Sequence, residues 1–180
     1  MTAETAPTTA GAASWDALFY ERLKANRIDF VAYVPDLVLA PLCARLEADA
    51  AVTTVIATRE EEAVGLVCGA HLGGKRPALL LQSSGFGNTL NAFGSLALPY
   101  QFPFLLVVSP RGVMNEFNPV QVPLGRAVPA ILDALGIQHY TLTDPARAGE
   151  IVDRTIKLIF ATRQPAALLV SPLLTGGKDG

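Results

Sequence analysis

The stretch Pro77-Ala78-Leu79-Leu80-Leu81-Gln82-Ser83-Ser84-Gly85-Phe86-Gly87-Asn88 decides the fold, because an apolar run passes directly into a segment with two glycines. An apolar run of this length without polar alternation is typical of a strand that is buried on both faces of a parallel sheet. We interpret residues 83–87 as a loop that leads into a helix near Asn88. The run Phe104-Leu105-Leu106-Val107-Val108 repeats the apolar pattern and indicates a second buried strand.

Strand and helix patterns alternate over the rest of the chain. Strands are expected at 30–34, 52–57, 78–82, 104–108, 139–142 and 167–170. Helices are expected at 14–26 with Ser14 as cap, after Asp36 to about 48, at 60–72, from about 88, at 126–135 and at 145–162. This alternation predicts an α/β fold: a doubly wound, mainly parallel six-stranded sheet with helices on both faces. The segment 109–125 is expected to be a long loop, and loops of that length are often functional.

The chain is expected to form a single domain over 14–175, followed by a short polar tail over 176–180. Residues 1–13 are rich in Ala and Thr and are expected to be disordered. They lack the basic start and apolar segment of a secretory signal, so the expected location is the cytoplasm. Cys43 and Cys68 stand among apolar residues, which favours buried thiols in a reducing compartment.

Charge and composition exclude several classes of partner. The net charge is −2 and no basic stripe is visible, so nucleic acid is not an expected partner. No apolar run reaches the roughly 18 residues of a membrane helix. The cysteines and the histidines, His71 and His139, lack metal-ligand spacing, so no metal site is expected in this chain. A content of 51% hydrophobic and 17% charged residues also favours a large subunit interface.

Ligands in parallel α/β sheets bind beyond the carboxyl ends of the strands. That edge is predicted to carry Pro35-Asp36, Arg59-Glu60, the segment 83–88 and the residues from Ser109 onward. The two glycines at 85 and 87 do not complete a dinucleotide fingerprint, because Leu90 stands where the third glycine belongs. They could still present backbone N–H groups to a ligand, or simply form a tight turn.

Three consecutive glutamates, Glu60-Glu61-Glu62, open the helix at 60–72. Carboxylates in a first helical turn are stabilised by the helix dipole, and this alone can explain their presence. The alternative is that one of them is a buried carboxyl at the sheet edge that hydrogen-bonds a nitrogen of a cofactor. Three adjacent acids cannot all point into one pocket, so at least one is expected to be solvated.

The ordered motifs 58–65, 69–75 and 82–88 resemble the pyrimidine-binding domain of sulfopyruvate and phosphonopyruvate decarboxylases. Val34-Pro35-Asp36, Arg111-Gly112, the segment 121–126 and the segment 132–136 extend the resemblance, which runs from about Phe30 to Gly136. The chain is most similar in length to the separate alpha subunit of sulfopyruvate decarboxylase.

The resemblance implies a thiamine diphosphate enzyme in which an activating glutamate precedes a glycine by nine residues. Glu60 stands nine residues before Gly69, so Glu60 is the implied catalytic residue, which would donate to the N1′ nitrogen of the cofactor pyrimidine. The implied cofactor-binding residues are Glu60, Pro35, Ser83, Gly85, Gly87 and Asn88. The implied substrate-binding residues are Asp36, Leu37, Gln82, Ser84, Arg111 and Arg126.

The family binds the diphosphate and Mg²⁺ through Gly-Asp-Gly followed by a downstream Asn, and this chain lacks that motif. The resemblance therefore implies a beta subunit with the Mg²⁺ site, and a hetero-oligomer with two or more copies of each chain. The implied reaction converts a small 2-oxo acid, most similar to sulfopyruvate or phosphonopyruvate, into an aldehyde and CO₂. The alternatives are a carboligase subunit, a decarboxylase of a less polar 2-oxo acid favoured by Leu37, and a non-catalytic regulatory module.

Overall fold

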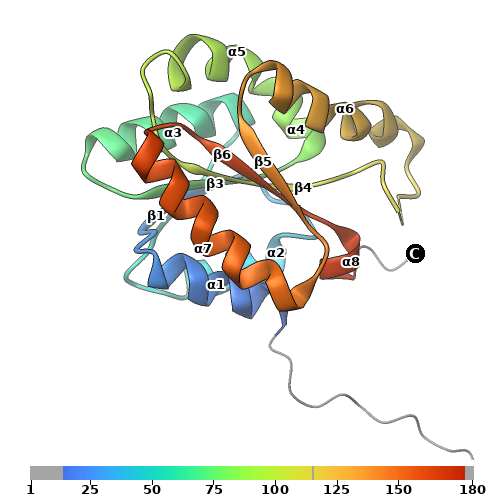
Figure 1. Cartoon of the computed structure of the whole chain (residues 1–180), viewed down its shortest axis with the longest axis horizontal. Coiled ribbons are helices and arrows are strands. Elements are labelled where there is room, and N and C mark those ends of the chain that lie inside the picture. Colours follow the sequence, from blue (N-terminus) through green and yellow to red (C-terminus); the bar gives the residue numbers. More distant parts are fainter. Residues whose placement is uncertain (1–13, 115, 177–180) are drawn as a thin grey trace, which may run out of the picture.

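The computed structural model describes residues 14–114 and 116–176, which fold around one central sheet (Figure 1). All five neighbouring strand pairs are parallel, in the order β2-β1-β3-β4-β6-β5. The strands are β1 (Phe30–Tyr33), β2 (Thr53–Ile56), β3 (Pro77–Gln82), β4 (Leu105–Ser109), β5 (Gln138–Leu142) and β6 (Ala166–Val170). The predicted α/β fold with a doubly wound, six-stranded sheet is confirmed.

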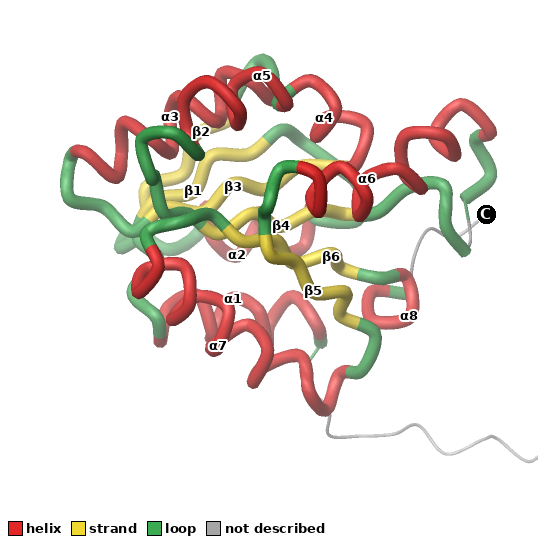
Figure 2. The backbone as a smooth tube through the Cα atoms, turned by 45° about the horizontal axis from the view of Figure 1, so that its top comes forward, coloured by secondary structure: helices red, strands yellow, loops and turns green. Residues whose placement is uncertain are grey.

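Helices cover both faces of this sheet (Figures 1 and 2). One face carries α1 (Trp15–Ala25), α2 (Ala40–Glu47) and α7 (Pro145–Thr162). The other face carries α3 (Glu60–Leu72), α4 (Ser83–Asn88), α5 (Leu90–Ala92), the π-helical η1 (Phe93–Ala97) and α6 (Val122–Ala134). The 3₁₀ turn η2 (Pro119–Gln121) leads into α6, and α8 (Pro172–Thr175) follows β6.

The central strands supply both apolar cores, which is why their sequences show no polar alternation. In β3, Leu80 belongs to the core under α1, α2 and α7, whereas Leu79 and Leu81 belong to the core under α3 to α6. Leu79 pairs in register with Leu106 of β4, and both side chains are fully buried. Removing a leucine of this kind costs about 2–5 kcal/mol, so these two strands anchor the fold.

The predicted loop over 83–87 is wrong, because α4 begins at Ser83 directly after β3. The glycines of this segment serve close packing between elements. A Cβ atom on Gly85 would collide with the side chain of Glu60, and one on Gly87 would lie 2.6 Å from Leu124 Cδ2. Tertiary packing therefore overrides the local turn preference of glycine.

The predicted long loop over 109–125 is also too long, because α6 begins at Val122 and not at Arg126. Pro123 stands in the first turn, where a missing N–H is tolerated. Gly125 then packs against the chain after β4, where a Cβ atom would collide with the carbonyl of Arg111. Among the described residues, the irregular segment is limited to 110–114 and 116–118.

The helix expected directly after Asp36 begins later, at Ala40. Asp36 nevertheless caps the preceding turn, because its Oδ1 accepts the backbone N–H groups of Val38 at 3.0 Å and Leu39 at 3.2 Å. At α1, Ser14 is the N-cap residue as expected, although its side chain makes no capping hydrogen bond. Short polar side chains such as that of Asp36 are as compatible with turns as with helix caps, which explains the later start of α2.

The predicted disordered segment 1–13 and residues 177–180 of the predicted tail lie outside the described residues. Within the described ranges, no helix has both the length and the apolar character needed to cross a membrane.

The chain leaves the neighbouring strands β1 and β3 toward opposite faces of the sheet. The helix after β1 is α2, on one face, and the helix after β3 is α4, on the other (Figure 1). Such a switch point opens a crevice at the carboxyl ends of the two strands, and open α/β sheets bind ligands there.

Candidate active site

The three glutamates at the start of α3 have three different surroundings. Glu61 Oε1 accepts from Arg59 Nε at 2.7 Å, and Arg59 is largely exposed. Glu62 Oε2 accepts the backbone N–H of Thr58 at 2.8 Å. Glu61 and Glu62 therefore bond residues that directly precede α3.

Glu60 turns instead toward α4, on the side of the switch point. Asn88 Nδ2 donates to Glu60 Oε2 at 3.1 Å. The rest of the half-buried carboxylate lies in the space that Gly85 leaves open. Among residues 14–114 and 116–176, no donor is found for the second oxygen, Oε1, so this oxygen remains available to a ligand.

A buried polar cluster lies where β1, β3 and β4 end. Asp36 Oδ1 accepts from Ser109 Oγ at 2.9 Å, in addition to the two backbone N–H groups of its turn. Asp36 Oδ2 lies 3.5 Å from Arg111 Nη1, and Gln82 Oε1 accepts from the same nitrogen at 3.1 Å. The side chain of Asp36 is only 2% exposed. A carboxylate bonded in this way is held in one orientation.

Both the backbone N–H and the guanidinium of Arg111 donate hydrogen bonds to neighbouring residues. Its backbone N–H donates to Ser83 Oγ at 2.9 Å. Its guanidinium, 9% exposed, donates from Nε to Glu116 Oε2 at 2.6 Å and from Nη2 to Glu116 Oε1 at 3.4 Å. Two carboxylates, Asp36 and Glu116, thus face one guanidinium, and the cluster carries a negative formal charge.

The other implied residues lie around this cluster without joining it. Pro35 and Leu37 are exposed, and Leu37 shows 72% of its surface. Ser84 is half-buried in the first turn of α4, and Gly87 lies on the same helix against Leu124 of α6. The structure therefore brings together Asp36, Gln82, Ser83 and Arg111, and separately Glu60, Gly85 and Asn88.

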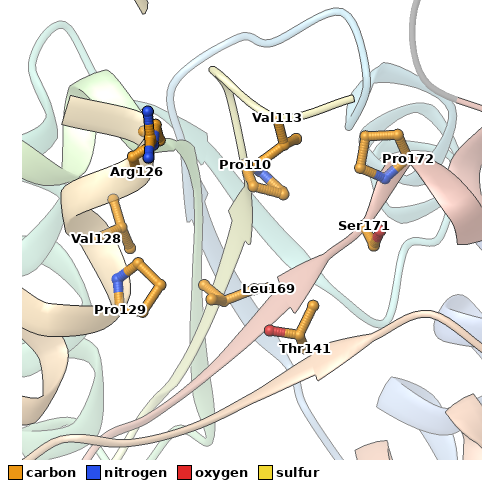
Figure 3. Close-up of a pocket in the computed structure, with 10 residues that line it drawn as sticks. Pro110, Val113, Arg126, Val128, Pro129, Thr141, Leu169, Ser171 and Pro172 are labelled. Atoms are coloured by element: carbon orange, nitrogen blue, oxygen red, sulfur yellow. The ribbon is translucent and has the colours of Figure 1, made fainter. Parts of the chain in front are cut away.

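Arg126 lies apart from both groups, on α6. It lines an apolar pocket of about 310 Å³ beyond the carboxyl ends of β4, β5 and β6 (Figure 3). Thr141 and Ser171 contribute hydroxyls to this pocket. Its remaining walls are Pro110, Val113, Gly125, Val128, Pro129, Leu169 and Pro172.

A smaller pocket of about 220 Å³ lies beside Asp36, under α2. Burial, and then the nearby carboxylates of Glu47 and Asp36, raise the pKa of the Cys43 thiol to about 12. Burial also raises the pKa of Tyr33, whose hydroxyl donates to Glu47. Both groups stay protonated near neutral pH, so neither is a ready nucleophile. Within the described ranges, no group of three or more His, Cys, Asp or Glu side chains could hold a metal ion.

The sequence placed the residues from Ser109 onward at the carboxyl edge of the sheet, but it named neither Ser109 nor Glu116 as a site residue. Ser109 is the last residue of β4, a polar residue at the carboxyl end of an apolar run. Glu116 stands in the irregular segment after β4, five residues from Arg111, and no periodic pattern relates the two.

Together these features define a parallel α/β domain with carboxylates at its switch point. No family model matches the chain. It is 39% identical over 154 residues to sulfopyruvate decarboxylase subunit alpha of Methanocaldococcus jannaschii, covering 86% of this chain and 91% of that protein. It is also 39% identical to the subunit of the same name from Methanothermobacter thermautotrophicus, covering 84% and 92%. The chain therefore belongs to the family of sulfopyruvate decarboxylase alpha subunits.

The phosphonopyruvate decarboxylase of Streptomyces viridochromogenes is related as well. It is 34% identical over 115 residues, which are 63% of this chain but only 29% of that longer protein. The related region thus occurs both as a separate subunit and as a minor part of one chain. Both resemblances stated from the sequence are confirmed, and the relatives support a decarboxylase subunit.

Proposed function

We propose that this chain is the pyrimidine-binding alpha subunit of a thiamine diphosphate-dependent decarboxylase of small 2-oxo acids. The observation that carries the proposal is the placement of Glu60. It is the one glutamate of α3's first turn that faces α4, at the edge where ligands of α/β sheets bind.

The residues around Glu60 fit the pyrimidine of the cofactor. A carboxyl group that bonds a ring nitrogen needs a fixed orientation and a free oxygen. Asn88 fixes the orientation of the Glu60 carboxylate by donating to Oε2, and Oε1 remains available to bond the ring nitrogen. Gly85 supplies the space, since any larger residue would take the position of the carboxylate.

Within this proposal each residue has a defined task. Glu60 holds a proton against the pyrimidine N1′, and the half-buried setting strengthens that hydrogen bond. Pro35 follows β1, and Ser83 and Gly87 belong to α4, so all three stand beyond the carboxyl ends of β1 and β3. Bound thiamine diphosphate supplies the electron sink for the bonding pair that the departing CO₂ leaves behind.

The proposal requires a beta subunit that holds the diphosphate and Mg²⁺. Two findings support it: close relatives are named as alpha subunits, and the related region fills under a third of a longer decarboxylase. Large apolar side chains are also exposed after the carboxyl ends of β4 and β6, where a partner would cover them. These are Val113, Met114, Phe117, Val120 and Leu173.

The proposed substrate is a 2-oxo acid similar to sulfopyruvate or phosphonopyruvate, and the proposed products are an aldehyde and CO₂. A carboligase would use the same residues of this chain and remains the second candidate. A less polar 2-oxo acid is favoured only if Leu37 lines the closed site, since it is exposed in the single chain.

The test compares the purified chain with its complex with the cognate partner. CO₂ release is measured from sulfopyruvate, phosphonopyruvate and 3-methyl-2-oxobutanoate. We expect no turnover by the single chain and turnover by the complex, with a preference for an anionic tail. Turnover by the single chain would refute the divided active site. A complex that binds the cofactor but turns over none of these acids would favour the carboligase or the regulatory module.

A further inference from the structure

The guanidinium of Arg111 offers two edges, and each edge is occupied differently. Nη1 faces Asp36 and Gln82, which stand at the ends of β1 and β3. Nε and Nη2 both donate to the carboxylate of Glu116, at 2.6 Å and 3.4 Å. This two-point pairing is the geometry in which a guanidinium binds a free oxyanion.

The two carboxylates stand in different parts of the fold. Asp36 also accepts from Ser109 and from two backbone N–H groups, so it is part of the framework at the sheet edge. Glu116 comes from the irregular segment between β4 and η2. Its Oε1 also accepts the backbone N–H of Asn118, a contact within the same segment. Glu116 thus belongs to a segment outside the regular elements, whereas Asp36 stands at the edge of the sheet.

We propose that Glu116 occupies the edge of Arg111 that receives the second anionic group of the substrate, a sulfonate or phosphonate, and that this group displaces Glu116. The inference rests on the proposed function and adds a residue that sets substrate specificity. With Glu116 in place, the cluster already has two carboxylates against one guanidinium. A third anion in a site this buried would be strongly unfavourable, so Glu116 and the substrate tail exclude each other.

Glu116 then acts as an internal competitor of the substrate tail. A 2-oxo acid without a second anion gains nothing from its removal. An acid with a sulfonate must first displace the carboxylate, and its apparent affinity is reduced accordingly. Replacing Glu116 by Gln removes the competing charge but retains the shape and one acceptor oxygen.

The test uses Glu116→Gln and a matched control, Glu150→Gln. Glu150 also accepts from an arginine, Arg154, at 2.7 Å, but on the exposed surface of α7. In the complex, we expect Glu116→Gln to lower KM for sulfopyruvate by about tenfold and to change KM for pyruvate by less than about twofold. Glu150→Gln should match the wild type. Equal effects on both acids, or none on sulfopyruvate, would overturn the inference.

A binding measurement on the full chain separates this inference from the proposed function. Sulfoacetate is titrated while the ¹⁵N resonance of Arg111 Nε is followed, with sodium chloride at equal ionic strength as control. We expect about tenfold tighter binding in Glu116→Gln than in the wild type. Isothermal titration calorimetry, which needs no reporter at position 111, should show that adding Arg111→Lys removes this gain. A shift of this resonance without any decarboxylation by the complex would refute the proposed function alone. An active complex in which sulfoacetate never perturbs Arg111 would refute the inference alone.

Discussion

Gly85 provides the space in which the side chain of Glu60 lies. A Cβ atom at position 85 would stand 2.6 Å from both Cγ and Cδ of Glu60, closer than such atoms approach in real proteins. The two residues belong to different helices, α3 and α4, and the hydrogen bond from Asn88 fixes the same carboxylate from the second helix. The position of the carboxylate thus depends on a residue without a side chain.

Gly85→Ala should separate function from stability. The atoms that would be displaced belong to a flexible side chain, so the fold should persist and the free energy of unfolding should change by less than about 2 kcal/mol. Glu60 must move, so thiamine diphosphate binding by the complex should weaken by at least about tenfold. Thermal unfolding of the chain and cofactor titration of the complex measure the two effects.

Gly65→Ala is the control for that experiment. Gly65 lies inside α3, and a Cβ atom there would meet nothing within 4 Å. Alanine should therefore stabilise the single chain by about 0.5–1 kcal/mol through helix propensity. If both alanine variants changed cofactor binding equally, space beside Glu60 would not be the cause.

Arg111→Met should strongly destabilise the chain. It would leave the carboxylates of Asp36 and Glu116 without their cation in a site where both are almost fully buried, at a cost of about 3–5 kcal/mol. Arg154→Met removes an exposed pair with Glu150 and should cost less than about 0.5 kcal/mol. Urea unfolding of the two variants compares them, and a loss below about 1 kcal/mol for Arg111→Met would mean that the cluster is not held together by charge.

The thiols of Cys43 and Cys68 should be unreactive in the folded chain. Burial raises the pKa of both to about 12, so almost no thiolate exists at neutral pH. A thiol reagent such as Ellman's should label neither residue until the chain unfolds. Rapid labelling at pH 7.5 in the absence of denaturant would contradict the buried placement of both thiols.

The same two pKa values set a direction for alkaline stability. The unfolded thiols lose their protons near pH 9, whereas the folded thiols keep theirs to about pH 12. Between these values the folded state binds more protons than the unfolded state, so the free energy of unfolding should fall as the pH rises. Replacing both cysteines by Ala should flatten that decline, as urea unfolding between pH 8 and pH 10 would show.

The sheet could be predicted because buried parallel strands leave a clear trace in the sequence. The runs at Leu79–Leu81 and Leu105–Val108 are apolar at every position, since each faces a core on either side. The choice of Glu60 among three glutamates came from family spacing, and the structure turns that glutamate toward α4. Its catalytic role stays a prediction.

The start of α4 and the role of Glu116 could not be predicted, for physical reasons. Glycine has a local preference for turns, whereas Gly85 and Gly87 are needed for contacts with residues distant in sequence. Glu116 lies in an irregular segment, and its contact with Arg111 depends on how the chain folds back after β4. Contacts of this kind leave no periodic signal.

The role proposed for Glu60 is tested most directly by hydrogen–deuterium exchange at C2 of thiamine diphosphate bound to the complex. We predict that Glu60→Gln slows this exchange by at least about a hundredfold, because the proton held at the pyrimidine nitrogen is lost. In Glu61→Gln and Glu62→Gln, the cofactor C2 should exchange at nearly the wild-type rate, since those side chains bond Arg59 and the backbone N–H of Thr58. Wild-type exchange in Glu60→Gln, or its loss in Glu61→Gln alone, would contradict the account.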